Sequence, residues 1–588
     1  MKQVYSVLVA FLMLLCAQES SAQVSVTATA GTMGPTTYTT LREAFDSVNS
    51  GRHQGAIVIT ISANTTEVKT DSLGAGATFT SLLVKPAPGT TPIVTGAFTT
   101  QLVYLNRTKN VTIDGSNTVN GTTKNLTLVN TDPAGNGIKM INGASFNTIK
   151  NCVIKGASAS SAVISFSTAG GSGVTSGNSH NLIQNNDITN STTLPNYGIV
   201  NTGSNATLAN KGNAILGNRI FNFRSAGFLD GNGTNGFSDS TLVEGNEIYE
   251  MVDTISTAVK GIRVNNATGV KNMVLSKNYI HDLKGLGAVY GIEVFNDSSL
   301  LIVNNMISLD NATATSLVGI RQGNGSLVTR TYHNTVYIAG VAAGVTAESY
   351  AFYKSYTSTK DTVLNNIFVN ARTTVGTGKQ YAIGLYDSIG TMVSNYNDLA
   401  STGGANSFIG VKKNATASTD YATLAAWTAA TSDDANSVSI MPTFVSPLDL
   451  HIVNTSANAG LDNKGTPVGV TIDYDNQARS NSTPDLGADE FTITATSLAI
   501  VNQDVLSSKL SPSIVRSQTT LNVVSKTAMS IRWTVADASG KVVKTFVQQA
   551  VAGSNDLNLQ MSNLSSGIYS ITGVSSKGTI PAIRFVKQ

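Results

Sequence analysis

The sequence predicts an all-β fold in which most of the chain winds into a right-handed parallel β-helix. Three observations support this prediction. Only 12% of the residues are charged and 6% are aromatic, while 53 glycines and many Asn, Ser and Thr residues separate short Val, Ile and Leu runs. A motif of the form apolar-apolar-x-x-Asn-x-Ile recurs along the chain, and a second strand-like motif recurs in phase with it. These features are typical of a solenoid.

The first motif has a shared position, usually Asn, that returns every 27 to 34 residues. This position is occupied by Cys152, Asn186, Asn218, Asn246, Asn278, Asn305, Asn334, Asn366 and Asn397. The separations between successive positions vary around a single mean, which indicates about nine turns of the solenoid joined by loops of different length. We expect the Asn side chains to stack at a bend, since Asn tolerates left-handed backbone angles and forms local hydrogen bonds.

The second motif lies roughly 20 residues upstream of the first, in segments such as 197–201, 260–264 and 290–294. Two short strands per repeat leave too little chain for a crossover helix, so each repeat should coil onto the one before it. Equivalent strands would then lie about 4.8 Å apart, with Ile and Val in interior ladders. A β-propeller is the competing architecture, but its blades need about 40 residues and four strands each.

The N-terminal end begins with residues 1–22, which have the pattern of a secretory signal peptide: Lys2, an apolar stretch and a small-residue cleavage site. Residues 23–62 should cap the solenoid. Within them Thr40 and Glu43 form a capping box, and the apolar residues that follow share one helical face.

Residues 63–400 are predicted to form the β-helix, and residues 401–491 its C-terminal cap with a short helix at 420–427. Residues 492–504 have the composition of a linker. The last segment, 505–588, changes to alternating strands with hairpin signals and should form a separate small β-sandwich.

Charge and cysteine content exclude several classes of function. The formal net charge is +3, with no basic run, so nucleic acid is not expected as a partner. After removal of the signal peptide Cys152 is the one remaining cysteine, which excludes an internal disulfide. No later segment is long and apolar enough for a transmembrane helix.

One outward-facing column of the second motif carries the best candidate chemistry. It contains Lys139, Arg263, Glu293, Arg321 and Tyr353. Polysaccharide lyases of this kind of fold need a base and a cation near a uronate carboxylate, which the trio of Arg263, Glu293 and Arg321 could supply. Lys139 and Tyr353 are candidate binding residues. A structural ion-pair ladder has the same composition and is favoured.

The acidic residues near the end of the predicted cap are a candidate Ca²⁺ site, formed by Asp473, Asp475, Asp485 and Asp489. Because Arg479 lies among them, salt bridges within the cap are the favoured alternative. No other cofactor is expected. His281 and His333 have different offsets from the Asn bend, which disfavours a shared metal site.

The last 84 residues contain several recognisable motifs, including VADASGKVV (535–543), LSSGIY (564–569) and the terminal RFVKQ. They resemble the type A sorting domain of the type IX secretion system of Bacteroidota. One departure is Leu510-Ser511-Pro512, where that family usually begins with Pro-Asn-Pro. The resemblance implies the secretion machinery as a partner and an extracellular or outer-membrane-surface location.

The body resembles right-handed parallel β-helix proteins of the pectate-lyase-like group, which includes enzymes and members without known activity. Fold does not determine function. Since no convergent catalytic set accompanies the export signals, the favoured hypothesis is an adhesin-like or carbohydrate-binding surface protein without catalysis. The alternative is an extracellular polysaccharide lyase or glycoside hydrolase, for which a groove above the trio would be evidence.

Overall fold

The computed structural model describes residues 22–493 and 502–588, apart from residues 75, 160, 168–172, 232–235, 253–254, 256, 271, 298, 324–327, 345, 356–359 and 387–390. The chain divides into two compact units, Met1–Ile493 and Thr494–Gln588. The predicted signal peptide lies almost wholly outside the described residues, as does most of the predicted linker.

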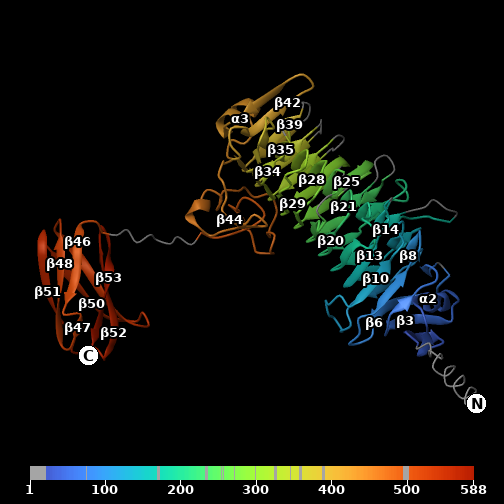
Figure 1. Cartoon of the computed structure of the whole chain (residues 1–588), viewed down its shortest axis with the longest axis horizontal. Coiled ribbons are helices and arrows are strands. Elements are labelled where there is room, and N and C mark those ends of the chain that lie inside the picture. The colour runs from blue at the N-terminus through green and yellow to red at the C-terminus, as the bar shows by residue number, and fades with distance from the viewer. Residues whose placement is uncertain are drawn as a thin grey trace, which may run out of the picture. The chain divides into compact units, whose positions relative to one another are not determined.

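The first unit is a parallel β-helix with three long sheets, which we call A, B and C (Figure 1). They contain 14, 12 and 13 strands. Successive strands along the chain enter sheets A, B and C in turn, and each strand pairs in parallel with the strand of the next turn. The predicted all-β solenoid is confirmed.

Every turn contributes one strand to each sheet, and these strands have the following bounds. Sheet A contains β3 (His53–Ile61), β6 (Phe79–Pro86), β9 (Val111–Asp114), β12 (Thr148–Lys150), β15 (Leu182–Gln184), β19 (Ala214–Leu216), β23 (Leu242–Glu244), β26 (Met273–Ser276), β29 (Leu300–Val303), β32 (Val328–Tyr332), β36 (Lys360–Leu364) and β40 (Thr391–Asn395). Sheet B contains β4 (Thr65–Thr66), β7 (Ile93–Gly96), β10 (Leu126–Asn130), β13 (Cys152–Gly156), β16 (Asp187–Asn190), β20 (Arg219–Phe221), β24 (Glu247–Tyr249), β27 (Tyr279–His281), β30 (Met306–Leu309), β33 (Thr335–Ile338), β37 (Ile367–Asn370) and β41 (Asp398–Ser401). Sheet C contains β5 (Asp71–Leu73), β8 (Gln101–Asn106), β11 (Asn136–Ile141), β14 (Ala162–Ser167), β17 (Tyr197–Thr202), β21 (Ala226–Asp230), β25 (Val259–Val270), β28 (Ala288–Asp297), β31 (Ser316–Gln322), β35 (Glu348–Lys354), β39 (Gln380–Tyr386) and β42 (Ser407–Lys413).

The solenoid is longer than the Asn repeat predicts. Three turns, from β3 to β11, precede the turn that contains Cys152. They lack the Asn motif, although the second motif is present in β11, at 136–140. The repeat search misses β14 in sheet C, because Val163 stands where neighbouring turns have a small residue such as Gly198 or Gly227.

The core is a set of stacked apolar side chains from all three sheets. In sheet A, for example, Ile149, Ile183, Ile215 and Val243 occupy equivalent positions on consecutive strands, and all are fully buried. The predicted interior ladders of Ile and Val are therefore confirmed. Burial of such side chains is the main stabilising contribution to a solenoid without disulfides.

The repeated Asn residues form a continuous buried ladder between sheets A and B. Each side-chain Oδ1 accepts hydrogen bonds from the backbone N and from Nδ2 of the Asn one turn earlier. For Asn278, the donors are N and Nδ2 of Asn246, at 3.1 and 3.0 Å. Its own Nδ2 donates to the Val243 carbonyl at 2.9 Å. The predicted amide stacking is confirmed.

The repeated Asn residues do not themselves adopt the left-handed backbone angles expected at this bend. The left-handed backbone angle belongs to the preceding residue, such as Asn185 (φ 51°), Gly217 (φ 59°) or Lys277 (φ 54°). The ladder Asn itself is not among the residues with positive φ. Asn is required because its amide can bond both to the next amide and to a carbonyl of the preceding turn.

A second, shorter Asn ladder lies between sheets C and A. Asn147 bonds to Asn181, and Asn181 to Asn213, with Nδ2 to Oδ1 distances of 3.0 and 3.1 Å. In the sequence, an Asn stands five residues before each of the first three repeat positions. The sequence analysis did not predict this second ladder.

At the N-terminal end, β1 (Val24–Gly31) pairs antiparallel with β3 and with β2 (Thr36–Tyr38). Helix α2 (Leu41–Asn49) buries Leu41, Ala44, Phe45 and Val48, as predicted. The capping box is half formed. Thr40 accepts the Glu43 N–H at 3.1 Å, but the Glu43 carboxylate bonds to Thr39 rather than to Thr40.

At the other end β43 (Ser418–Tyr421) pairs antiparallel with β42, and α3 (Leu424–Thr431) places the fully buried Trp427 against Gly410. The predicted helix at 420–427 therefore begins late, because Asp420 and Tyr421 belong to β43. The N-cap is Thr423, whose hydroxyl accepts the Ala426 N–H.

Residues 435–491, the C-terminal segment, run back along the outside of sheet B. The segment includes β44 (Phe444–Ser446), β45 (Asp449–Ile452) and the 3-10 helix η2 (Ser456–Asn458). Apolar residues such as Leu461 and Leu486 pack on Ile367 and Val369 of sheet B. Farther back along the sheet, Leu450 packs on Met306.

The second unit is a two-sheet sandwich, as predicted. One sheet consists of β46 (Val505–Ser511), β48 (Gln518–Ser525) and β51 (Gly553–Gln560), and the other of β47 (Ile514–Val515), β49 (Met529–Asp537), β50 (Val542–Ala550), β52 (Gly567–Ser575) and β53 (Gly578–Lys587). Both sheets contribute to one core around Trp533. In the described part of the chain, no helix is long and apolar enough to cross a membrane.

Candidate binding face

The outer face of sheet C, which we call the sheet C face, carries the candidate residues predicted from sequence. Arg263, Glu293, Arg321 and Tyr353 occupy neighbouring positions on consecutive strands. The column deduced from the repeat has the observed register, except that it omits Ser165 of β14, which lies next to Lys139.

The trio is arranged as an ion-pair ladder with Glu293 in the middle. The Glu293 carboxylate is only 3% exposed, and it lies 3.2 Å from Arg263 Nε and 2.9 Å from Arg321 Nη1. Arg321 also donates to Ser355 Oγ and to the Tyr290 hydroxyl. The carboxylate is thus shared between two guanidinium groups from the strands on either side of it.

Lys260 joins this cluster and was missed by sequence reasoning. It lies three residues before Arg263 on β25, and its ammonium is 5.9 Å from the centre of the Tyr290 ring. Burial lowers the pKa of Lys260, and the charges of Arg263 and Arg321 lower it further against the opposing effect of Glu293. The signal in the sequence was a charged residue directly before Gly261, where other turns have Tyr.

A column of mostly aromatic residues runs beside the charged column. Tyr290, Val318, Tyr350, Tyr381 and Phe408 occupy equivalent positions on five successive strands. They form an apolar cluster outside the main core. The ring centres of Tyr350 and Tyr381 are 5.1 Å apart in a stacked arrangement, and Tyr381 and Phe408 are 5.9 Å apart.

Positively charged groups lie over these rings. Arg321 is 5.3 Å from the Tyr290 centroid, and Lys413 is 5.4 Å from that of Tyr350. Such cation–π contacts are worth about 0.5–2 kcal/mol each, depending on desolvation. The repeated Tyr at this position was visible in the sequence as the Tyr-Gly and Tyr-Ala pairs, but it was not considered as a site.

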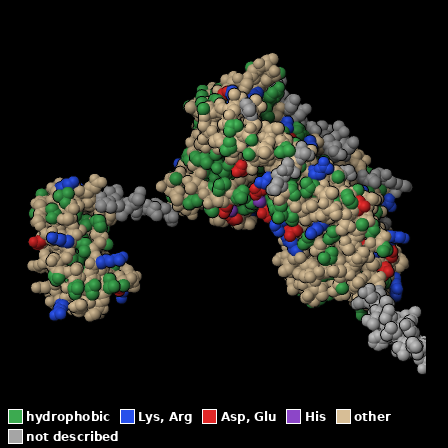
Figure 2. All heavy atoms as spheres, in the orientation of Figure 1, with side chains coloured by type: hydrophobic (Ala, Val, Ile, Leu, Met, Phe, Trp, Pro, Cys, Tyr) green, Lys and Arg blue, Asp and Glu red, His purple; other side chains and the backbone are tan. Residues whose placement is uncertain are grey.

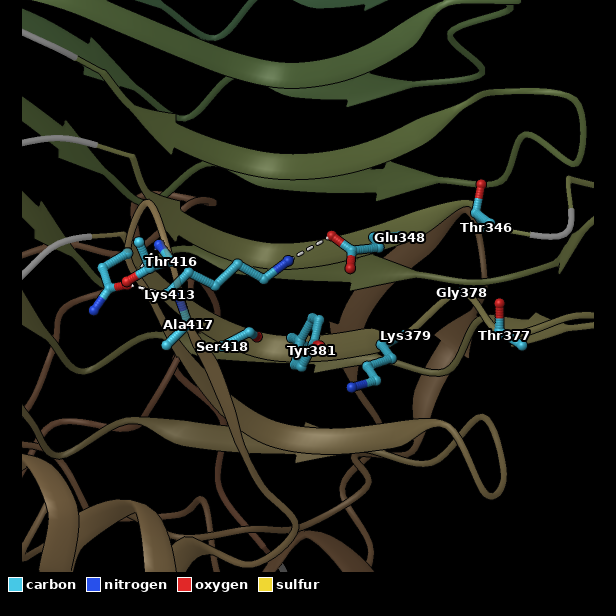
Figure 3. A pocket seen from close by; sticks show the side chains of 11 residues that line it. Thr346, Glu348, Thr377, Gly378, Lys379, Tyr381, Lys413, Thr416, Ala417 and Ser418 are labelled. Atoms are coloured by element: carbon cyan, nitrogen blue, oxygen red, sulfur yellow. Dashed lines mark hydrogen bonds and ion pairs between the residues drawn. The ribbon is translucent and has the colours of Figure 1, made fainter.

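The C-terminal end of the sheet C face contains an open pocket of about 490 Å³ (Figure 3). Glu348, Lys379, Tyr381 and Lys413 line it, together with the polar turn at 414–418. Lys413 Nζ lies 2.7 Å from Glu348 Oε2. Figure 3 shows this pair pointing toward each other across the pocket.

The tyrosine hydroxyls at this pocket are hydrogen-bond donors. Tyr381 donates to Asp420 Oδ1 at 2.9 Å, and Tyr350 donates to Glu348. Burial raises the pKa of both hydroxyls well above the ordinary value, and the neighbouring carboxylates raise it further. Both groups therefore remain protonated at neutral pH.

Lys139 lies in a second pocket of the same face, about 290 Å³ in volume and nearer the N-terminal end. Tyr197, Ser165 and Thr202 also line it. Tyr353 lies on β35, the strand that also contains Glu348, and stacks on Tyr350 with a centroid distance of 4.4 Å. Burial raises the pKa of Tyr353 to about 12.

The predicted acidic cluster is held by the backbone of the C-terminal segment. Asp473 accepts hydrogen bonds from Gln477 and Glu490, and Asp485 from Asn463 and Phe491. Two further contacts complete the set: Asp489 accepts from the Ile452 N–H, and Arg479 pairs with Glu490 at 3.0 Å. Burial raises the pKa of Asp485 to about 7.

In the described part of the chain, no group of three or more His, Cys, Asp or Glu side chains converges as metal ligands would. Asp475 faces His451 instead, at 2.8 Å. Calcium binding therefore stays a prediction. His333 is fully buried, and burial lowers its pKa well below the ordinary value, whereas His281 lies on the outer side of sheet B.

The fold and the second unit together define the class of protein: a secreted, cell-surface or extracellular β-helix protein handled by the type IX secretion system. Residues 516–587 match the family described as the secretion system C-terminal sorting domain, which confirms the resemblance seen in the sequence. No curated protein matches the chain.

Two solved structures are similar to the chain at low identity. The Streptococcus pneumoniae surface protein and adhesin PfbA is 11% identical, with a TM-score of 0.33, over 63% of this chain and 94% of that one. A tailspike of an Acinetobacter phage is 10% identical, with a TM-score of 0.18, over 90% of this chain and 76% of that one. Neither similarity carries an assignment of function.

Proposed function

We propose that this protein is an adhesin-like surface protein that binds a glycan along the sheet C face without transforming it. The observation that supports this proposal is the aromatic column with its attached cations on one outer face of the solenoid. Tyr350 and Tyr381 are buried within this column, so the ring surface that a ligand could meet comes from the partly exposed Tyr290, Tyr353 and Phe408. The neighbouring Lys379 and Lys413 supply hydrogen-bond donors.

The chemistry of the face suits a sugar chain. Tyrosine rings offer apolar area at a low cost in conformational entropy. Since the Tyr350 and Tyr381 hydroxyls donate to Glu348 and Asp420, hydrogen bonds to a sugar would come from the polar groups around the rings. The 414–418 turn adds Thr, Ser and Asn side chains next to Lys379 and Lys413. Small-molecule binding sites typically combine a partly apolar surface with a small number of precisely placed polar groups.

Binding is favoured over catalysis by the environment of Glu293. The Glu293 carboxylate is buried and is held by Arg263 and Arg321, so its oxygens are occupied by protein groups and closed to a bound polysaccharide. Removing one partner of such a buried pair would destabilise the fold by leaving a charge unpaired. This arrangement supports a structural role for the trio.

The test is a glycan array probed with the mature full-length chain, followed by titration of the glycans that bind. Replacing Lys413 with Met removes a cation that lies over two rings of the face, and we expect affinity to fall by roughly tenfold. The matched control is Lys150→Met in sheet A, which should bind normally. Equal binding by the Lys413 variant, or no bound glycan, would contradict the proposal.

A second candidate is a polysaccharide lyase, favoured by one observation. Lys260 has a lowered pKa and lies beside Arg263 and Arg321, so it could act as a base next to two cations. This candidate predicts absorbance from unsaturated products on uronate-containing polysaccharides. It also predicts that Lys260→Met abolishes turnover in a folded protein, whereas undiminished turnover would exclude Lys260.

A further inference from the structure

A separate pocket lies on the outside of sheet B, where the C-terminal segment ends its run along the solenoid. Its volume is about 270 Å³. Tyr279 and Met306 come from β27 and β30, and Leu448, Asp449, Leu450, His451 and Tyr474 come from the C-terminal segment. The pocket therefore exists only because the segment packs on the solenoid.

The wall of the pocket continues into a row of stacked rings on the part of sheet B that lies before it. The centroid distance is 4.2 Å between Tyr279 and His281, 5.1 Å between His281 and Tyr249, and 5.2 Å between Tyr249 and Phe221. All these pairs are nearly parallel. Together they form a ring-lined surface across three turns of the helix.

Paired charges surround this surface on both sides. On the segment side, His451 lies between Asp449 and Asp475, 2.8 Å from the latter. On the solenoid side, His281 contacts Asp282 at 2.8 Å and Glu247 at 3.4 Å, and Glu247 also pairs with Arg219. Figure 2 shows histidine, acidic and basic side chains gathered together near the centre of the larger unit.

We infer that this pocket is a second binding site, for one neutral pyranose residue of a glycan. The apolar face of a pyranose can lie against Tyr279 or Tyr474, as sugar rings and aromatic rings both present flat C–H or π surfaces. The Asp449 carboxylate lines the pocket, and the exposed Asp475 carboxylate lies next to it, 2.8 Å from the lining residue His451. Both are acceptors suited to sugar hydroxyls.

The charges of the site select a neutral ligand. Asp449 and Asp475 share one partner, His451, so the rim of the pocket is acidic and disfavours an anionic sugar such as a uronate. A neutral sugar avoids this repulsion. A purely apolar ligand would leave the rim carboxylates and His451 without water or new partners, which is costly. A polyhydroxylated ring with an apolar face meets both requirements.

A second site on sheet B would allow bivalent binding, which the sheet C face alone does not. Because the pocket is on sheet B, one protein molecule would hold two glycans at once, independently of each other. Two linked sites raise overall avidity for a surface that displays many copies of a ligand.

The test uses saturation-transfer NMR and calorimetry on the mature full-length protein with methyl glycosides of glucose, galactose, mannose and N-acetylglucosamine. Cyclohexanol serves as a ring without the hydroxyl array. We expect saturable, millimolar binding of at least one glycoside and no comparable binding of cyclohexanol. Tyr474→Leu keeps apolar volume without the ring, and Asp475→Asn removes an exposed carboxylate; each should weaken binding roughly fivefold.

Lys413→Met on the sheet C face is the matched variant for the other site and should leave this binding unchanged. The two proposals can therefore fail separately. The inference is overturned if no glycoside saturates, if cyclohexanol competes equally, or if binding persists in both Tyr474→Leu and Asp475→Asn while circular dichroism shows both variants folded.

Discussion

At the scale of single residues, the buried amides decide how one turn is joined to the next. Along the main ladder, each Asn from 186 to 366 donates to the Asn of the following turn and to a carbonyl of the preceding one. A carboxylate or an aliphatic side chain cannot do both. The ladder ends at Asn397, whose Nδ2 donates to Ser394 of β40 and to Asp434 of the cap instead of to a further Asn.

We predict that Asn278→Ala destabilises the solenoid by about 2–5 kcal/mol, because it orphans the Asn246 N–H and the Val243 carbonyl inside the core. The free energy of unfolding in urea measures the effect. Asn481→Ala, at an exposed position of the C-terminal segment, is the control and should change stability by no more than about 0.5 kcal/mol. Equal effects of the two substitutions would contradict a structural role for the ladder.

At the scale of elements, the C-terminal segment is the part whose behaviour should depend most on pH. Burial alone would lower the pKa of His451, but its hydrogen bond with Asp449 and the charges of Asp475, Asp489 and Asp449 raise it overall. The charged imidazole therefore helps to hold β45 and the 471–475 turn together, beside the pocket on sheet B.

Because the folded pKa of His451 lies above its unfolded value of about 6.5, its contribution to stability is fully present below pH 6.5. It is lost as pH rises through the folded pKa. We therefore predict that the stability difference between the natural protein and His451→Gln shrinks when pH rises from about 6 to 9. Thermal melting at several pH values measures this difference. A difference that is constant or grows with pH would show that the histidine does not act through its charge.

At the scale of the whole molecule, the two compact units have separate cores and separate tasks. The solenoid core runs from Val24 to Trp427, and the sandwich core is centred on Trp533. The second unit matches the sorting-domain family, whereas the sheet C face and the pocket on sheet B belong to the first.

We predict that a chain ending at residue 493 folds with an unchanged melting temperature for the first unit but is not exported, because the sorting signal is removed. Calorimetry of the purified shortened chain and fractionation of the producing cells check the two halves of the prediction. A control with Lys541→Ala in the exposed β49–β50 turn should be exported normally. Surface display of the shortened chain would contradict the assigned role of the second unit.

Much of this architecture can be predicted from the sequence because each turn of a solenoid uses a similar pattern of buried and exposed residues. The Asn spacing predicted the coiling, and the alternation around Ile262 and Ile292 predicted that Arg263 and Glu293 would lie outward on adjacent strands. The predicted range of 63–400 includes most of the first three turns, but the Asn repeat did not resolve their strands, except β11, and it missed β14, since these parts of the core lack the Asn marker.

The sequence by itself determined the all-β solenoid and the column that contains Arg263, Glu293 and Arg321, since these depend on short periodic motifs. It also determined the sorting domain, through several motifs that resemble a known family. Only the tertiary structure decided that Glu293 is as little as 3% exposed between the two arginines, that Lys260 joins them, and that Tyr279 meets Tyr474 and His451 in a pocket. The physical reason is that side-chain burial depends on three-dimensional packing, and that the pocket joins residues whose separation follows no repeat. Tyr279 and His451 are brought together by the packing of the C-terminal segment on sheet B, which local periodicity does not encode.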